Sequence, residues 1–342
     1  MSVTGTTLHR RISSPVYGHL VSLSDDIGLF EHADGDVPRQ EHGYCVDDVA
    51  RALIVAVREP SDQLAGLATT SLEFLARAIG DGGRSHNRMS VTGEWTDEPD
   101  LGDWWGRSAW ALGTAAARNP DLRWRARAHF MRLAATRSPH VRSMAFAALG
   151  AAELVLAGDR DRRLVYLVLD ALDIVPQQPT NVWAWPEDRL RYGNGSLAEA
   201  VIAAGAALEK PAVLEGGLAM LDALLDLETR DDHLSVAGTA GRGAADIAAQ
   251  FDQQPIEVAA IADAAARAHD ATGDPRWLSA VGLAWRWFLG TNDSATPMVD
   301  LATGAGYDGL ERTGRNDNRG AESTLAALST WQHAHRLGVL EQ

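Results

Sequence analysis

The sequence predicts an all-α fold, an (α/α)6 toroid in which six helical hairpins form an inner and an outer ring. Three observations predict it. Helical periodicity runs through nearly the whole chain with almost no strand alternation, apolar helices alternate with amphipathic ones, and long connections alternate with short ones. The 342 residues suffice for one large domain, and no shift in composition marks a boundary. We therefore expect a single domain over residues 1–342.

Twelve helices follow from the apolar periodicity, with glycine and proline at or near their ends. The even-numbered helices are apolar nearly all round, and Ser108–Ala117 carries no charge. A helix without a polar face must be surrounded by protein, so these should form the inner ring. The odd-numbered helices, such as Arg160–Val175, are amphipathic and should form the outer ring. The expected spans are residues 8–24, 47–59, 62–79, 105–118, 123–137, 142–157, 160–175, 196–209, 211–228, 255–272, 275–290 and 320–337.

The connections that lead from an odd to an even helix are mostly long, and only 138–141 is short. The connections that lead from an even to an odd helix are all short. Loops of more than about 12–15 residues are uncommon and are often functional. If the inner helices all begin at one end, these loops and the helix N-termini form a shared rim there. The long connections are residues 27–46, 80–104, 176–195, 229–254 and 291–319.

Composition and charge exclude several classes of partner. Acidic residues outnumber basic ones by 46 to 31, and the resulting net charge of −15 repels nucleic-acid phosphates and anionic lipids. No stretch approaches the roughly 20 apolar residues of a membrane span, and no apolar signal-peptide segment is present. Cys45 is the single cysteine, and histidines at metal-ligand spacing and phosphate-binding loops are absent. We expect a cytoplasmic protein without a metal or cofactor.

Two adjacent aspartates, Asp47 and Asp48, stand at the start of an otherwise apolar helix, and Arg51 follows one turn later. One aspartate could serve as an N-cap, because its charge complements the helix dipole. Two aspartates and an arginine leave a charged cluster on a buried helix, which is costly unless the charges are paired. We therefore expect this cluster to belong to a functional site.

Four other segments bring polar and aromatic side chains to the same rim. Tryptophan offers a flat surface for a sugar ring, and a glutamine side chain both donates and accepts hydrogen bonds, which suits polyols. The structural alternatives are helix capping for the aspartates, core packing for the tryptophans, loop solvation for the glutamines and a buried ion pair for the last glutamate. The candidates are His86, Asn87, Asp103, Trp105 and Arg107; Trp183, Trp185, Glu187, Asp188 and Asn194; Asp252, Gln253 and Gln254; and Tyr307 and Glu322.

Several carboxylates beside tryptophan and amide side chains, without a cofactor motif, favour cleavage of a glycosidic bond. That reaction needs one carboxylic acid and one carboxylate that acts as base or nucleophile. We assign Glu187 as the acid and Asp48 or Asp103 as the base, and the remaining candidates to substrate binding. The expected partner is an oligosaccharide or glycoside.

Four stretches of the chain resemble bacterial proteins of the six-hairpin glycosidase-like superfamily, whose members often carry the name glycosyltransferase. The resemblance covers nearly the whole chain and implies an (α/α)6 barrel that acts on carbohydrate. It implies no catalytic pair. Where it would place Ser-His before Gly106, this chain has Trp104 and Trp105, a departure that bears on substrate choice. The stretches are His42–Leu53, Phe251–Glu257, Trp287–Asp293 and Gly320–Thr324.

Three other functions also fit the sequence. A sugar epimerase on the same toroid would use a histidine pair drawn from His32, His42, His86 and His233. An enzyme specific for uronic acids would use arginines, which Arg51, Arg88, Arg107 and Arg189 could supply. A carbohydrate-binding partner of a glycosyltransferase would bind a glycan without turnover.

Overall fold

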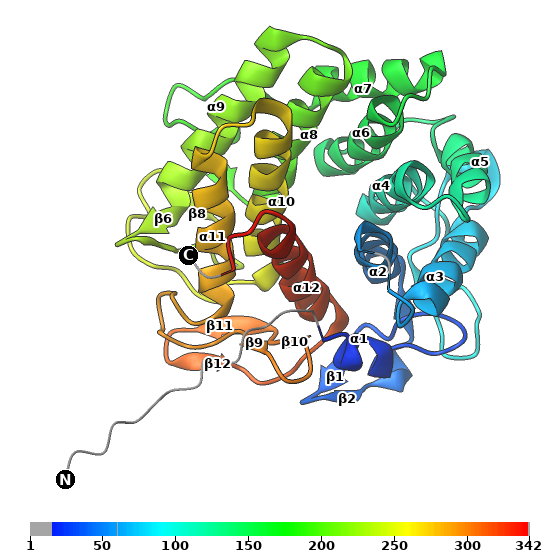
Figure 1. Cartoon of the computed structure of the whole chain (residues 1–342), viewed down its shortest axis with the longest axis horizontal. Helices are drawn as coiled ribbons and strands as arrows, with labels where there is room; N and C mark the ends of the chain where they lie inside the picture. The colour runs from blue at the N-terminus through cyan, green and yellow to red at the C-terminus, as the bar shows by residue number, and fades with distance from the viewer. Residues whose placement is uncertain (1–15, 60, 341–342) are drawn as a thin grey trace.

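The computed structural model describes residues 16–59 and 61–340, and it confirms the (α/α)6 toroid. The inner helices surround a central axis (Figure 1). Each packs against the next one in this inner ring, and the last packs back against the first, which closes the ring. The inner helices are α2 (Val46–Arg58), α4 (Asp103–Arg118), α6 (Val141–Leu156), α8 (Asn194–Ala207), α10 (Pro255–Thr272) and α12 (Ala321–Arg336).

The outer ring lies around these helices, and each outer helix packs against the inner helix that precedes it in the chain. The sixth outer position differs from the expected helix over residues 8–24. Residues 8–15 lie outside the described residues, and the described part is the short helix α1 (Gly18–Ser22), which packs against α12. The other outer helices are α3 (Ala65–Ala78), α5 (Arg123–Leu133), α7 (Arg162–Ile174), α9 (Pro211–Glu228) and α11 (Arg276–Phe288).

Burial follows the predicted alternation of helix character. The inner helix α4 buries nearly every residue after its first turn, whereas its outer neighbour α5 buries only Ala126, Phe130 and Leu133. Glycine lets the inner helices approach closely. A Cβ atom on Gly113 of α4 would lie 2.3 Å from the carbonyl oxygen of Gly150 on α6, so the two helices touch through their backbones.

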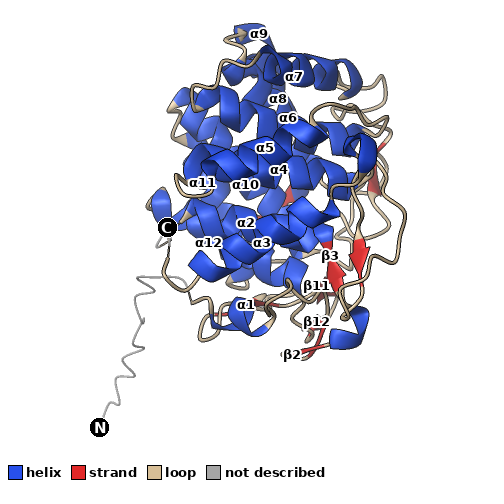
Figure 2. Ribbon diagram, turned by 90° about the vertical axis from the view of Figure 1, so that its right-hand side faces the viewer, coloured by secondary structure: helices blue, strands red, loops and turns tan. Residues whose placement is uncertain are grey.

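The long connections form short antiparallel strand pairs that the sequence did not predict, because two or three residues are too few to show alternation. Figure 2 shows that these strands gather mostly at one end of the toroid, together with the long loops. The pairs are β1 (Ala33–Asp34) with β2 (Val37–Pro38), β3 (Tyr44–Cys45) with β4 (Arg88–Met89), β5 (Arg189–Leu190) with β8 (Arg242–Gly243), β6 (Thr229–Arg230) with β7 (His233–Leu234), β9 (Val299–Asp300) with β10 (Ala305–Gly306), and β11 (Gly309–Glu311) with β12 (Gly314–Asn316).

All six inner helices begin at the end that carries the long loops. The positive ends of their helix dipoles therefore converge there, an environment that favours carboxylates. Among the described residues, no helix combines the length and the apolar character needed to cross a bilayer.

Candidate active site

A cavity of about 440 Å³ opens among the N-termini of the inner helices; we call it the rim cavity. Charged side chains dominate its lining, and carboxylates outnumber guanidinium groups by seven to three. A surplus of negative charge attracts cations and repels anionic substrates. The carboxylates belong to Glu31, Asp47, Asp48, Asp103, Glu257, Asp308 and Glu322, and the guanidinium groups to Arg51, Arg88 and Arg107.

A second cavity of about 680 Å³ adjoins the first and shares Asp47, Asp103 and Tyr192 with it; we call it the side cavity. Asn87 and Glu187 line its other parts. Pockets of roughly 300–1,000 Å³ hold ligands larger than one sugar ring. The two cavities together therefore have the size of an oligosaccharide site.

Asp48 is a buried acid of the rim cavity, and 3% of its surface is exposed. Its Oδ1 lies 2.6 Å from Nη1 of Arg51, whose Nη2 lies 2.7 Å from Glu322 Oε2. Burial raises the pKa of Asp48 to about 7, against the opposing effect of Arg51 and with a further increase from Glu322. A carboxyl group with a pKa near neutral suits general acid catalysis.

The neighbouring Asp47 pairs with a different arginine, Arg107. Its Oδ1 lies 3.2 Å from Nε of Arg107, whose guanidinium stacks 4.0 Å from the ring centre of Phe146. Burial raises the pKa of Asp47, and Arg107 opposes that increase. The two adjacent aspartates thus have different cationic partners, so each side chain is oriented separately.

Asp103 lies between the two cavities, at the first residue of α4. Its Oδ1 accepts a hydrogen bond from the Ser143 hydroxyl at 3.0 Å. Burial, followed by the charge of Asp103, raises the pKa of Tyr192 to about 12, so the phenol keeps its proton. Asp103 therefore sits where a substrate that spans both cavities would pass.

Glu257 is a cavity acid that the sequence analysis did not single out. Its Oε1 accepts the Gly193 N–H at 2.6 Å, and its Oε2 accepts from the Asn194 side chain at 3.3 Å. Burial raises the pKa of Glu257, and the hydrogen bonds from the backbone N–H groups of Gly193 and Asn194 oppose that increase. Asn194 is fully buried and holds Glu257, so its predicted substrate contact is wrong. The signal that could have identified Glu257 is the one that identified Asp48: an acidic residue in the first turn of an otherwise apolar helix.

Glu187 lines the side cavity and is bound by Arg142 through both of its oxygens, at 3.0 and 2.8 Å. Both oxygens of Glu187 therefore accept charge-assisted hydrogen bonds from the Arg142 guanidinium, which holds the side chain in place. The assignment of Glu187 as the acid stays a prediction.

Three predicted binding residues are part of the core. Trp105 and Trp185 are fully buried, and the Trp105 indole N–H donates to the Gly83 carbonyl at 2.9 Å. Gln253 is also fully buried, and its Nε2 donates to Asp293 at 2.6 Å. None of these side chains can touch a sugar, because all three are buried: Trp105 on helix α4, and Trp185 and Gln253 on loops that turn them inward.

The remaining predicted residues divide into two groups. Those that line neither cavity have protein or solvent contacts instead: His86 stacks on Trp95, the Trp183 indole donates to the Glu187 carbonyl, and arginines cover the Tyr307 ring. Asp188 and Asp252 are exposed. The residues that the structure does bring to the cavities are Asp47, Asp48, Arg51, Asn87, Asp103, Arg107, Glu187, Gln254 and Glu322.

The alternative functions rested on histidines and arginines. Of the four candidate histidines, His32 alone lines either cavity; His42 packs edge-on against it, and His233 contacts Asp293 at 3.1 Å. The three arginines of the rim cavity each contact a carboxylate, including Arg88 on Glu31. The fourth, Arg189, lines neither cavity; it donates to the Gly241 carbonyl at 3.0 Å and lies 3.5 Å from Asp246.

Glu31, Cys45 and Asp48 bring two oxygens and one sulfur within 4.8 Å of one another, an arrangement that could hold a metal ion. Arginine guanidinium groups already contact both carboxylates. Burial, reinforced by Asp47 and Asp48, raises the pKa of the Cys45 thiol, which therefore stays protonated. This donor set fits a metal ion poorly, and its thiol is a poor nucleophile.

No protein-family model and no curated protein matches the sequence. Solved structures do match. A sugar epimerase from a ruminal bacterium is 14% identical, with a TM-score of 0.72 over 96% of this chain and 97% of that chain. The chain has the six-hairpin (α/α)6 fold. Cellobiose 2-epimerase from Spirochaeta thermophila DSM 6192 is 12% identical (TM-score 0.66, 96% and 95% covered).

An α-1,6-mannanase of Salegentibacter sp. HEL1_6 is 10% identical, with a TM-score of 0.68 over 95% of this chain and 97% of that chain. That structure is an inactive variant in which two adjacent aspartates are replaced by alanine, in complex with α-1,6-mannotetrose. The fold of this chain is thus shared by enzymes that isomerise sugars and by enzymes that cleave glycosidic bonds.

Proposed function

We propose that this protein is a glycoside hydrolase that cleaves a neutral oligosaccharide in the rim cavity, with Asp48 as the general acid. The observation that carries the proposal is the buried Asp48 carboxyl, whose pKa is raised to about 7 inside a cavity lined by other carboxylates. A carboxyl group that is still protonated near neutral pH can deliver a proton to a leaving oxygen.

The proposed reaction uses two carboxyl groups. Asp48 protonates the glycosidic oxygen as the bond to the anomeric carbon breaks, and Arg51 stabilises the carboxylate that remains. Asp103 serves as the base that activates water or as the nucleophile, since it lies where the two cavities meet. The surplus of carboxylates stabilises the positive charge that develops on the sugar ring.

The charge of the cavity supports a neutral substrate over a uronic acid. Seven carboxylates face three guanidinium groups, and each of those arginines already contacts a carboxylate. A sugar carboxylate would add a further negative charge. Gln254 and Asn87 offer amide groups that suit hydroxyl groups. The inactive mannanase variant lacks two adjacent aspartates, and this chain has two adjacent aspartates, Asp47 and Asp48, in its rim cavity. This likeness supports hydrolysis.

Epimerisation is the second candidate, because sugar epimerases share the fold. Proton transfer at a ring carbon by two histidines would need both rings in the cavity. Of the candidate histidines, His32 alone lines it, which favours hydrolysis by carboxyl groups.

The test is incubation of the protein with α-1,6-manno-oligosaccharides, cello-oligosaccharides and matched uronic acid oligosaccharides, with chromatographic analysis of the products. We expect shorter neutral oligosaccharides, and a loss of about 10²–10⁴-fold in rate for Asp48→Asn. The matched control is Asp226→Asn, an exposed position on outer helix α9, which should keep full activity. Near-normal turnover by Asp48→Asn would remove Asp48 from the acid role. Intact sugars of changed configuration would indicate an epimerase, and binding without turnover a non-catalytic protein.

A further inference from the structure

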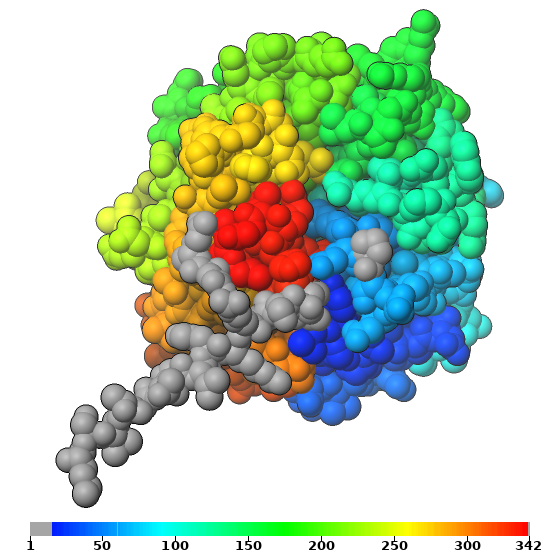
Figure 3. Space-filling view, viewed as in Figure 1, coloured from blue at the N-terminus to red at the C-terminus, as the bar shows by residue number. Residues whose placement is uncertain are grey.

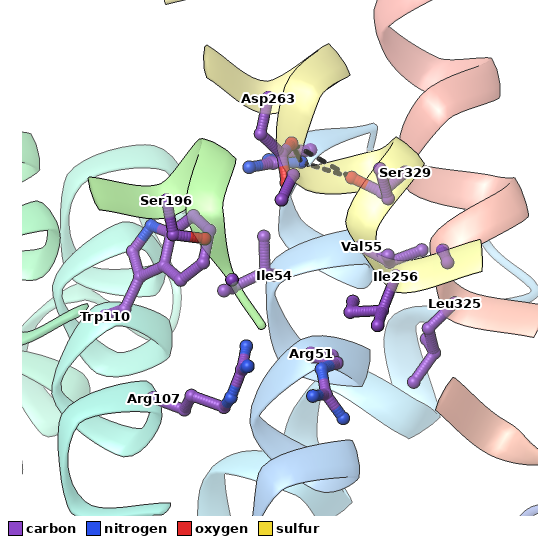
Figure 4. A pocket seen from close by; sticks show the side chains of 15 residues that line it. Arg51, Ile54, Val55, Arg107, Trp110, Ser196, Ile256, Asp263, Leu325 and Ser329 are labelled. Atoms are coloured by element: carbon purple, nitrogen blue, oxygen red, sulfur yellow. Dashed lines mark hydrogen bonds and ion pairs between the residues drawn. The ribbon is translucent and has the colours of Figure 1, made fainter. Parts of the chain in front are cut away.

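The rim cavity narrows toward the axis of the toroid to an apolar waist. Figure 4 shows this waist, a space of about 40 Å³ into which Ile54 and Leu325 project, with Arg51 and Arg107 at its rim end. A space of this size has room for about one or two water molecules and is too small for a sugar ring. Figure 3 shows the face beyond the waist, where the red atoms of α12 lie beside the yellow atoms of α10. A sugar chain in the rim cavity therefore cannot continue toward that face.

The side cavity offers a path in another direction. It shares Asp47, Asp103 and Tyr192 with the rim cavity, and its volume is about 680 Å³. An oligosaccharide with one ring in the rim cavity can therefore place its next ring in the side cavity, with the bond between the two rings near Asp103. The side chains that line the side cavity then decide which neighbouring ring is bound.

A tryptophan and a tyrosine line the side cavity. The structure describes all eleven tryptophans of the sequence, and Trp104 alone among them lines either cavity. Trp104 is partly exposed, whereas its neighbour Trp105 is fully buried. The tyrosine is Tyr192, with 49% of its surface exposed. A pyranose ring presents apolar C–H groups on its faces, and contact with an aromatic ring removes that apolar surface from water.

The Trp104 ring is held in place before any ligand binds. Its indole Nε1 donates to the Ser85 carbonyl at 2.7 Å. Its six-membered ring rests on Gly102, where a Cβ atom would lie 2.4 Å from Cη2 and Cζ3 of the ring. Because the indole N–H is already bonded, Trp104 offers the cavity apolar surface rather than a hydrogen bond. A ring that is fixed in advance also loses little conformational entropy on binding.

Arg142 holds the Tyr192 ring in a similar way. Its guanidinium lies 4.7 Å from the centre of that ring, and its Nε donates to the Tyr192 carbonyl. Both oxygens of Glu187 fix the guanidinium in turn. Since Arg142 covers one face of the phenol ring, the other face is left for a ligand. Asp47 and Asn87 line the same cavity and can bond to hydroxyl groups at the edge of a sugar.

We propose that the side cavity is a sugar-binding subsite, in which Trp104 and Tyr192 pack against a neutral pyranose ring next to the cleaved bond. The inference rests on the proposed function and adds that the substrate extends from the rim cavity into the side cavity. The fixed aromatic surface selects a ring with an apolar face, and the carboxylates of the lining disfavour an anionic one. Tetrasaccharides should therefore bind more tightly than single sugars, and most of that gain should depend on Trp104.

The test is a calorimetric titration of the Asp48→Asn protein, in which slow turnover allows binding to be measured. The ligands are α-1,6-mannotetraose and cellotetraose, each compared with the methyl glycoside of its single sugar, which fills the rim cavity alone. In this background, Trp104→Ala should weaken tetrasaccharide binding by about tenfold or more and leave methyl glycoside binding unchanged. The matched control is Trp124→Ala, at a tryptophan on α5 that is 77% exposed, and it should change neither affinity. If Asp48→Asn still cleaves, which contradicts the role of Asp48 alone, the same comparison is made on kcat/KM.

An unchanged tetrasaccharide affinity in Trp104→Ala would overturn the inference. An equal loss for tetrasaccharide and methyl glycoside would also overturn it, because it would indicate a structural role for the ring. If Trp104→Ala does not fold, Tyr192→Ala, at a half-exposed position, should show the same length-dependent loss. A length-dependent loss in a protein whose wild type cleaves neither tetrasaccharide would support the subsite and contradict hydrolysis. The absence of binding of both tetrasaccharides would overturn the subsite.

Discussion

Replacement of Asp48 by asparagine should change how stability depends on pH. In the native protein the pKa of this carboxyl is raised from 3.8 to about 7, chiefly by burial. Between these two values the native state holds a proton that the unfolded state has released, so the stability of the wild-type protein falls as the pH rises. About three pH units at 1.36 kcal/mol each give a loss of about 4 kcal/mol.

Asparagine has a similar shape and does not titrate, and Arg51 keeps Glu322 as an ionic partner. The free energy of unfolding of Asp48→Asn, relative to wild type, should therefore increase by up to about 4 kcal/mol between pH 4 and pH 8. Urea denaturation of both proteins across this range measures the difference, and Asp226→Asn controls for the loss of a carboxylate. A difference that stays constant, or that moves the other way with pH, would refute the assignment of a raised pKa. The rate of hydrolysis should likewise fall about tenfold for each pH unit above 7.

Three further predictions concern stability and substrate contact. Glu228 is buried, and burial chiefly raises its pKa to about 8. Glu228→Gln should therefore be more stable than wild type by about 2 kcal/mol or more at pH 9, and by much less at pH 5. Urea denaturation at the two pH values measures this difference. Gly150→Ala should lower the free energy of unfolding by about 2–4 kcal/mol, because its Cβ would lie 2.3 Å from the Ala109 carbonyl oxygen. The control is Gly66→Ala on α3, where the new Cβ meets open space, and this change should leave the free energy of unfolding unchanged or increase it. Trp105→Phe should lower the unfolding temperature and leave KM unchanged, and a raised KM would return this residue to the substrate site.

The architecture could be predicted from the sequence because it depends on local patterns. An inner helix such as α4 shows its position through the lack of a polar face, and the loop lengths show at which end the helices begin. The same reasoning places Asp47 and Asp48 at the rim, since a residue in the first turn of an inner helix must lie there.

The environment of each site residue could not be predicted in this way, because it depends on partners far apart in the chain. Glu187 is held by Arg142, 45 residues away in the sequence. Asp48 acquires its raised pKa through burial, to which Glu322 on the last helix adds. The sequence of a loop also does not reveal that Trp185 turns into the core.

The most direct test of hydrolysis at the rim cavity is mass spectrometry of the products formed from a cleaved oligosaccharide in water enriched in ¹⁸O. The proposed reaction predicts two shorter sugars, of which the one that carries the new reducing end contains a single ¹⁸O atom, and about 10²–10⁴-fold slower formation of that product with Asp48→Asn. An intact oligosaccharide that takes up deuterium at a ring carbon in heavy water, or cleavage by Asp48→Asn at a near-normal rate, would contradict it.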